Sequence, residues 1–417
     1  MSGFTRHQGT LACDGVSLTE AARSFGTPLY VYSAQAIRDA FCAYDQAFGS
    51  VRHRICYALK ANGSGALLRL LAGLGAGADI VSGGELLAAL RAGFPPEHIV
   101  FSGVGKTEDE LALGIEHDIA VFNAESEAEI ERIASVAARL GRCARVSLRV
   151  NPDIDPRSHP YISTGLSENK FGVDIRAAEE MLRRARVHTN LDLVGVQCHI
   201  GSQLMDLEPI AAAARELAAL SRRLLANGFA LRTIDLGGGL GIDYEGGSAG
   251  PDPRALAACV LPALEGLPLE LLLEPGRSLT ARAGALLTRV LYVKEGRGKR
   301  FVIVDAGMND LLRPSLYQAF HRIEPVELLS GPTSVADIVG PVCETGDFLA
   351  RGRELPAVAP GGLLAVLDAG AYGFVMASNY NMRPRAAEIL VDAGAATLVR
   401  RRESFDDLVR NEVASPW

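Results

Sequence analysis

Eight short apolar segments, each followed by a longer segment with helical periodicity, succeed one another between residues 34 and 285 of this 417-residue chain. The apolar segments end in Gly, Ser, Asn or a charged residue, as strands commonly do. The predicted strands lie at 55–59, 78–81, 99–102, 119–122, 145–150, 193–198, 233–236 and 269–273. Eight strand–helix units in about 250 residues predict a (β/α)8 barrel, whereas a doubly wound sheet rarely needs eight units in series.

The sequence changes character after Ala285. Short β-like segments punctuated by Gly, Pro and Asp replace the long helices, which indicates a smaller β-rich domain. Strands are predicted at 286–294, 300–304, 334–339, 363–366 and 396–400. The early segment Thr27–Ser33 is also β-like and can pair into this domain. We therefore predict an α/β chain with a barrel domain at 34–285 and a β-rich domain formed by 1–33 and 286–417.

Composition argues against several classes of protein. The net charge is 42 − 49 = −7 without a basic stripe, so nucleic acid is not an expected partner. No uncharged apolar run approaches the ~18 residues of a membrane span, and the N-terminal segment lacks the apolar core of a signal peptide. The seven cysteines are odd in number and contain no CxxC spacing, which argues against a disulfide framework or a zinc site. We expect a reduced, soluble, cytoplasmic protein.

Residues that can carry chemistry lie at the ends of the predicted strands. Lys60 follows the first strand, Asp79 lies in the second, His199 follows the sixth, Gly237–Gly239 the seventh, and Glu274–Arg277 the eighth. Taken singly, each has a structural explanation: a solvated lysine, a core histidine, turn glycines or a surface ion pair. Because the carboxyl ends of barrel strands meet at one mouth, where catalysis takes place in such folds, we favour a functional site.

This set of residues suits pyridoxal phosphate. A lysine after an apolar run can lose solvent, which lowers its pKa and makes it a nucleophile. The glycine cluster follows the seventh strand, where barrels commonly bind phosphate. Glu274 can keep a pyridine nitrogen protonated, and His199 can stack on the ring. The scattered histidines form neither HxxxH nor HExxH, so no metal site is predicted, and SGVGKT lacks the first glycine of a P-loop because residue 100 is valine.

Motifs that run in order from about Thr27 to Leu390 carry a resemblance to a known family. They are YALKAN, GADIVSGGEL, FSGVGKT, HIGSQ, DLGGGLGIDY, EPGRS, DAGMNDLLRPSLY, GPVCETGD and GAYGFVMASNYNMRPR. The chain resembles the diaminopimelate decarboxylase family, whose members are fold-type III, alanine-racemase-like enzymes. The resemblance implies a barrel with a C-terminal β-domain and pyridoxal phosphate as cofactor. It also implies decarboxylation of meso-2,6-diaminopimelate to L-lysine and CO2, the last step of bacterial lysine biosynthesis.

The same resemblance assigns roles to residues at the barrel mouth. It makes Lys60 the Schiff-base lysine, His199 the ring-stacking residue and Glu274 the partner of the pyridine nitrogen. The further cofactor-binding positions that it implies are Asp79, Ser202, Gly238, Gly239, Gly276, Arg277 and Tyr372. In the β-rich domain it makes Cys343 the proton donor after CO2 loss, and this cysteine reaches into the active site of the other subunit of a homodimer.

The residues implied to bind the substrate match its chemistry. They are Arg277, Arg313, Tyr317, Glu344 and Tyr372. The distal end of diaminopimelate carries a carboxylate and an ammonium, which need a forked donor and an anion respectively. Arg313 with Tyr317 suits the carboxylate and Glu344 the ammonium. Apolar neighbours on both sides of Arg313 indicate that it is buried. In a decarboxylase of ornithine or lysine, a buried guanidinium at this place would face the distal ammonium of the substrate, at a cost of several kcal/mol.

Three other functions remain as alternatives. A decarboxylase of this fold can act on another amino acid or on an aminoacyl group tethered to a carrier, but Arg313 and Glu344 favour the free zwitterionic end. A catalytically inactive homologue that only binds a regulator is disfavoured because all the expected catalytic residues are present: Lys60, His199, Glu274 and Cys343. An amino-acid racemase would need a second acid–base residue on the opposite ring face, and an arginine in place of Glu274.

Overall fold

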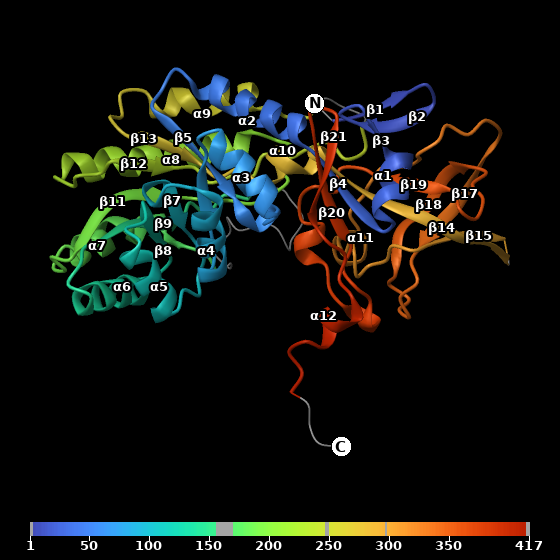
Figure 1. Ribbon diagram of the computed structural model, residues 1–417. Coiled ribbons are helices and arrows are strands. Elements are labelled where there is room, and N and C mark those ends of the chain that lie inside the picture. The colour runs from blue at the N-terminus through green and yellow to red at the C-terminus, as the bar shows by residue number, and fades with distance from the viewer. Residues whose placement is uncertain (1–2, 156–169, 247–249, 297, 414–417) are drawn as a thin grey trace. The chain divides into compact units, whose positions relative to one another are not determined.

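The computed structural model describes residues 3–155, 170–246, 250–296 and 298–413 (Figure 1). The chain forms two compact units. The first, called here the β-rich unit, comprises Met1–Asp39, Tyr244–Gly247 and Thr280–Trp417. The second, called here the barrel unit, comprises Ala40–Asp243 and Ser248–Leu279. The short segment Tyr244–Gly247 thus belongs to the β-rich unit although it lies within the barrel sequence.

The barrel unit contains a closed ring of eight parallel strands. They are β5 (His53–Ala58), β6 (Gly77–Ile80), β7 (Ile99–Phe101), β8 (Val121–Ala124), β9 (Ala144–Asn151), β11 (Leu191–Gln197), β12 (Thr233–Asp235) and β13 (Glu270–Leu273). Each strand pairs in parallel with the next. The last, β13, pairs with β5 and closes the ring. This confirms the predicted (β/α)8 barrel, with β10 (Val173–Asp174) as a short addition beside β9.

Helices precede the first barrel strand, connect the successive strands and follow the last one. They are α2 (Ala34–Phe48), α3 (Gly65–Gly73), α4 (Gly83–Ala92), α5 (Glu108–Glu116), α6 (Glu127–Arg139), α7 (Ile175–Ala185), α8 (Glu208–Ala226), α9 (Pro253–Leu264) and α10 (Arg277–Thr280), with the 3-10 turns η1 (Leu59–Ala61), η2 (Pro96–His98) and η4 (Ala281–Ala283). The side chains of Ser82, Thr107, Ser126, Asp174 and Asp252 cap α4, α5, α6, α7 and α9 by accepting a backbone N–H. Such caps satisfy amide groups that have no partner inside a helix, and so explain where these helices begin.

The β-rich unit is built on a sheet in the order β18-β17-β15-β14-β4-β20-β21. Its strands are β4 (Leu29–Ser33), β14 (Gly284–Gly296), β15 (Lys299–Val304), β17 (Thr333–Val339), β18 (Phe348–Pro356), β20 (Ala387–Asp392) and β21 (Ala395–Arg400). The N-terminal strand β4 pairs antiparallel with β14 and parallel with β20. It therefore lies inside the sheet, where its Leu29 and Val31 are fully buried.

Smaller elements complete the β-rich unit. They are β16 (Ile323–Pro325) and β19 (Leu363–Val366) beside β14, the sheet β1 (Phe4–His7), β2 (Thr10–Cys13) and β3 (Val16–Ser17), the helices α1 (Leu18–Phe25), α11 (Arg313–Tyr317) and α12 (Phe405–Val409), and the 3-10 turns η5 (Phe374–Met376) and η6 (Tyr380–Met382). The core of this unit joins apolar residues of β4, β14, β19 and β20. No helix in the described part of the chain combines the length and the apolar composition that crossing a membrane requires.

Candidate active site

Lys60 lies on the single turn η1 directly after β5, at the carboxyl end of the strand. Its Nζ lies 3.1 Å from Oδ2 of Asp79 on the neighbouring strand β6. Asp79 is fully buried, whereas the Lys60 side chain is 37% exposed. The sequence-based idea that apolar surroundings remove solvent from the lysine is therefore wrong. A buried carboxylate holds the amine at the barrel mouth instead.

Glu274 follows β13 and is 5% exposed. Its carboxylate accepts hydrogen bonds from Gln197 Nε2 at 3.2 Å, Asn123 Nδ2 at 3.4 Å and Ser102 Oγ at 3.5 Å. These donors come from the ends of three other barrel strands. Glu274 is thus held by hydrogen bonds from several strands of the ring.

Two further buried carboxyls act on Glu274. Burial, and then the negative charges of Asp235 and Asp79, raise the pKa of Glu274 well above its usual value. Burial raises the pKa of Asp235 to about 6, although a hydrogen bond from the amide of Gly237 works against this rise. Concentrated negative charge without solvent favours a proton or a bound cation, because either one relieves the repulsion. The strand ends therefore form a site suited to a positively charged group.

A glycine loop at 237–239 follows β12. Gly239 has a φ of +115°, and a Cβ on it would lie 2.6 Å from the carbonyl oxygen of Gly201. A Cβ on Gly238 would lie 2.3 Å from the carbonyl oxygen of Glu274. The backbone of the loop therefore packs against the loops after β11 and β13 at a distance that only glycine permits.

The glycine loop also contacts His199, which follows β11. The amide of Gly238 donates to Nδ1 of His199 at 3.2 Å. Burial, followed by the positive charges of Lys60 and Arg149, lowers the pKa of His199 well below its usual value. His199 is consequently a neutral ring at the edge of the glycine loop.

The loop after β13 brings the remaining predicted residues of the barrel unit to the same mouth. A Cβ on Gly276 would lie 2.9 Å from Cβ of Ala61, next to Lys60. Arg277 is 7% exposed, and its Nη2 donates to Oγ of Ser202 at 3.0 Å. Lys60, Asp79, His199, Ser202, the glycine loop, Glu274 and Arg277 thus form one connected cluster.

The other five predicted residues belong to the β-rich unit. Arg313 begins α11 and is 5% exposed. Tyr317 lies one turn further along the same helix, and side chains four residues apart share a helix face. Tyr372, after β19, has a φ of +56°, a left-handed conformation that residues with a Cβ rarely adopt and that clusters at functional sites.

Cys343 and Glu344 lie in the loop between β17 and β18, and both are exposed. The amide of Cys343 donates to Oδ1 of Asn381 at 2.7 Å. Asp347 anchors the loop, since its carboxylate accepts from the amides of Val342 and Met308, each at 2.6 Å. Tyr380 donates its hydroxyl to Glu344 at 3.4 Å. The loop therefore presents a thiol and a carboxylate on a well-anchored backbone.

Sequence reasoning missed several polar residues of the barrel mouth. Ser102, Asn123 and Gln197 donate to Glu274, and Asp235 shares a hydrogen bond with it. Arg149 forms a buried ion pair of 2.7 Å with Glu125. The predicted residues were sought mainly in the loops after the strands, whereas most of these side chains lie within the last residues of the strands themselves. A polar residue in the last two positions of an otherwise apolar strand end, as in VFNA or VGVQ, is the signal that could have found them.

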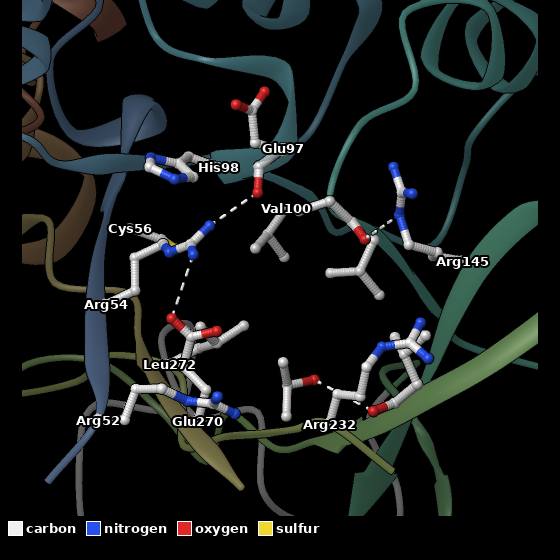
Figure 2. A pocket seen from close by; sticks show the side chains of 14 residues that line it. Arg52, Arg54, Cys56, Glu97, His98, Val100, Arg145, Arg232, Glu270 and Leu272 are labelled. Atoms are coloured by element: carbon white, nitrogen blue, oxygen red, sulfur yellow. Dashed lines mark hydrogen bonds and ion pairs between the residues drawn. The ribbon is translucent and has the colours of Figure 1, made fainter. Parts of the chain in front are cut away.

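A cavity of about 430 Å³ lies at the opposite, amino-terminal ends of the barrel strands (Figure 2). Its floor is apolar, and arginines surround it. The charges pair locally: Arg54 with Glu270 at 3.1 Å, Arg145 with Asp118 at 2.6 Å, and Arg232 with Asp192. The Cys56 thiol in the floor is fully buried, and burial raises its pKa well above the usual value, so it is not a nucleophile. We therefore place the candidate active site at the carboxyl ends of the strands.

The residues at that mouth fit pyridoxal phosphate. The cofactor carries an aldehyde for an amine, a phosphate and a pyridine nitrogen that is most useful when protonated. Lys60 offers the amine, the buried carboxyls around Glu274 favour the cationic nitrogen, and the glycine loop with Arg277 offers close backbone and a positive charge for phosphate. Among the residues that the structure describes, no three His, Cys, Asp or Glu side chains are arranged to hold a metal ion.

Comparison with known proteins identifies the family. The model of the pyridoxal-dependent decarboxylase pyridoxal-binding domain matches residues 34–281. A diaminopimelate decarboxylase of Aquifex aeolicus is 52% identical over 401 residues, which cover 96% of this chain and 95% of that protein. One of Pseudomonas aeruginosa is 50% identical over the full length of both chains. The structure of diaminopimelate decarboxylase from M. jannaschii in complex with L-lysine has a TM-score of 0.95 at 39% identity, covering 100% of this chain and 99% of that one.

Each relative covers both units of the chain, so the likeness is not confined to a shared barrel. A match of this extent, together with the geometry of the barrel mouth, leads to one conclusion. The chain belongs to the diaminopimelate decarboxylase family of pyridoxal-dependent decarboxylases.

Proposed function

We propose that this pyridoxal phosphate-dependent decarboxylase converts meso-2,6-diaminopimelate into L-lysine and CO2. The observation that carries the proposal is the connected cluster at the barrel mouth, in which the amine of Lys60 lies 3.1 Å from the buried Asp79 and shares the ring of strand ends with Glu274. The names of relatives about half identical to this chain supply the substrate.

Within this proposal the barrel unit binds the cofactor. When bound, pyridoxal phosphate supplies an electron-accepting ring that takes up the electron pair released as CO2 leaves. Lys60 would hold the cofactor through Nζ, and Asp79 would orient that amine. Glu274 would hold a proton on the pyridine nitrogen, and the neutral ring of His199 would pack against the cofactor. The amides of Gly238 and Gly239, with Gly276, Arg277 and Ser202, hold the phosphate region.

The β-rich unit contributes the substrate contacts. Arg313 and Tyr317 bind the distal carboxylate, Glu344 binds the distal ammonium, and Tyr372 and Arg277 contact both substrate and cofactor. The thiol of Cys343 delivers a proton to the carbon that has lost CO2, and the thiolate is then reprotonated from solvent. Exposure of Cys343 on an anchored loop supports a role toward a second chain. We infer a homodimer in which each Cys343 serves the active site of the partner subunit. We also propose that residues 34–285 form the cofactor-binding domain and that residues 1–33 and 286–417 form the β-rich domain.

Release of CO2 from four candidate substrates tests the proposed function. The purified protein with added pyridoxal phosphate is given meso-diaminopimelate, L-lysine, L-ornithine and L-arginine in parallel. We expect turnover of diaminopimelate alone, since only this substrate presents an anion to Arg313 and a cation to Glu344 at its distal end. Comparable turnover of lysine or ornithine would reassign the substrate, and no turnover of any of them would refute the proposal.

A matched pair of lysine variants completes this test. Lys60→Ala is expected to lose both activity and the absorbance band of the bound cofactor near the edge of the visible range. Lys294→Ala changes an exposed lysine of β14 and should retain both. An unchanged band in Lys60→Ala would show that the cofactor binds elsewhere.

A further inference from the structure

Arg313 is held by a histidine outside the set of residues predicted from the sequence. His321 lies four residues beyond the end of α11 and is fully buried. Its Nε2 lies 2.8 Å from Nη1 of Arg313, and its Nδ1 lies 2.9 Å from the carbonyl oxygen of Leu367. All three residues belong to the β-rich unit. The imidazole therefore bridges the guanidinium and the backbone just after β19.

Both contacts of His321 select the same form of the ring. A guanidinium only donates hydrogen bonds, so Nε2 must accept and carries no proton. A carbonyl oxygen only accepts, so Nδ1 must carry the proton. A doubly protonated ring would set an N–H and a positive charge against Arg313 at 2.8 Å in a buried place. His321 is consequently a neutral acceptor whose orientation the backbone determines.

Tyr244 completes the support of the guanidinium. The centre of the Arg313 guanidinium lies 4.6 Å from the centre of the Tyr244 ring, a cation–π contact. The rings of Tyr244 and His321 meet edge to face, with centroids 5.4 Å apart and planes at 73°. Tyr244 is 8% exposed and lies five residues after Gly239 in DLGGGLGIDY. One side chain thus limits movement of the guanidinium in its plane, and the other supports its face.

We propose that His321 is a positioning residue that sets the affinity of the enzyme for the distal carboxylate of its substrate. It acts through Arg313, which it holds in one orientation without neutralising its charge, whereas a carboxylate in the same place would compete with the substrate. A preorganised donor loses less rotational freedom on binding and so binds more tightly. This inference rests on the proposed function, because it concerns how Arg313 recognises diaminopimelate.

Two amide variants separate the two hydrogen bonds of the imidazole. In His321→Gln the amide oxygen can take the place of Nε2 and still accept from Arg313. In His321→Asn the amide nitrogen can take the place of Nδ1 and donate to Leu367, but the contact with Arg313 is lost. We expect His321→Asn to raise KM for meso-diaminopimelate on the order of 10-fold or more, the worth of a hydrogen bond to a charged group. We expect a small change in kcat, and a KM for His321→Gln within about 3-fold of wild type.

Two inhibitors show whether the effect passes through the distal carboxylate. L-Lysine retains that carboxylate, because the reaction removes the other one, whereas cadaverine (1,5-diaminopentane) has no carboxylate. His321→Asn should weaken inhibition by L-lysine about as much as it raises KM, and it should leave inhibition by cadaverine nearly unchanged. A side chain that merely fills the core would not distinguish the two inhibitors.

The outcomes separate this inference from the proposed function. If the wild-type holoenzyme releases no CO2 from diaminopimelate, the proposed function fails and the inference fails with it. If the wild type is active but the Asn and Gln variants lose the same activity and thermal stability, His321 only packs the core and the inference alone is overturned. His117→Asn, an exposed change on the barrel unit, is the control.

A third variant covers the case in which His321→Asn does not fold. Tyr244→Leu keeps an apolar side chain in the same place but removes the aromatic face beneath Arg313. It should raise KM for diaminopimelate several-fold, as expected for a partly buried cation–π contact, with cadaverine inhibition again unchanged. An unaltered KM in every folded variant would overturn the inference.

Discussion

The amide of Gly238 donates a hydrogen bond to Nδ1 of His199 over 3.2 Å. Since an amide can only donate, Nδ1 is unprotonated and the neutral ring carries its proton on Nε2. Burial, with the positive charges of Lys60 and Arg149, lowers the pKa of His199 and favours the same neutral form. The loop proposed to hold the phosphate therefore also orients the ring proposed to pack on the cofactor.

Two variants of His199 separate these roles. His199→Ala removes both the ring and the acceptor for Gly238, whereas His199→Asn can keep an acceptor near the position of Nδ1. We expect both to weaken pyridoxal phosphate binding on the order of 10-fold, because both lose the ring face. Only His199→Ala should also lower the stability of the cofactor-free protein, by about 1 kcal/mol, the net worth of one hydrogen bond. Absorbance titration and urea unfolding measure the two effects. Wild-type cofactor affinity in both variants would contradict the packing role.

The buried carboxyl of Asp235 predicts a pH-dependent stability. Burial raises its pKa to about 6 in the folded protein, so the folded state binds this proton more tightly than the unfolded state does. Stability therefore falls as pH rises from about 4 to about 6, and it remains lower above that range. Asp235→Asn has no proton to lose and can keep the acceptor for Gly237.

The cofactor-free Asp235→Asn protein should accordingly be more stable than wild type at about pH 8, by roughly 3 kcal/mol, with the difference vanishing near pH 4. Denaturant unfolding across this pH range measures the difference. Glu116→Gln, at an exposed position on α5, is the control and should show no such trend. A constant difference at all pH values would mean that folding does not raise the pKa of Asp235.

The barrel could be predicted from the sequence because its strands are apolar runs with helical segments between them. Each predicted strand lies within three residues of the observed one, since local periodicity and turn residues determine both. In the β-rich unit the same reasoning did not identify β16, β18 or β20. The missed strand β20 shows why. In β20, Glu388 is fully buried. The strand tolerates this buried charge because Tyr32 donates a hydrogen bond to Glu388 at 2.7 Å and Arg400 forms an ion pair with it. A charge neutralised by distant residues is invisible in a local pattern.

The residues of the candidate site likewise include some that the sequence could predict and some that it could not. Lys60, His199 and Glu274 could be found because each directly follows a strand in a fold whose strand ends converge. Tyr244 and His321 could not, since their importance lies in contacts with Arg313 that only the tertiary structure creates. Neither residue has sequence neighbours that indicate such a contact.

Arg313 should matter far more for the substrate than for the cofactor. Arg313→Ala removes the forked donor, and Arg313→Lys keeps the charge but not the planar pair of N–H groups. We expect kcat/KM for diaminopimelate to fall on the order of 100-fold in both, because a buried ionic contact loses one partner. Pyridoxal phosphate affinity should stay within about 3-fold of wild type by absorbance titration. An equal loss of cofactor binding would show that Arg313 maintains the fold rather than the substrate site.

Mixing two inactive variants tests whether active sites are shared between subunits. Lys60→Ala removes a barrel residue and Cys343→Ala a residue of the β-rich unit. In a hybrid dimer with exchanged cysteines, one site carries both changes and the other carries neither. Co-expression should therefore restore up to about one quarter of wild-type activity, since about half of randomly assembled dimers are hybrids with one intact site. Co-expression of Lys60→Ala with Glu274→Ala is the control, because both residues lie in the same barrel and every site stays defective. If the first mixture is as inactive as this control, each chain uses its own Cys343 or none.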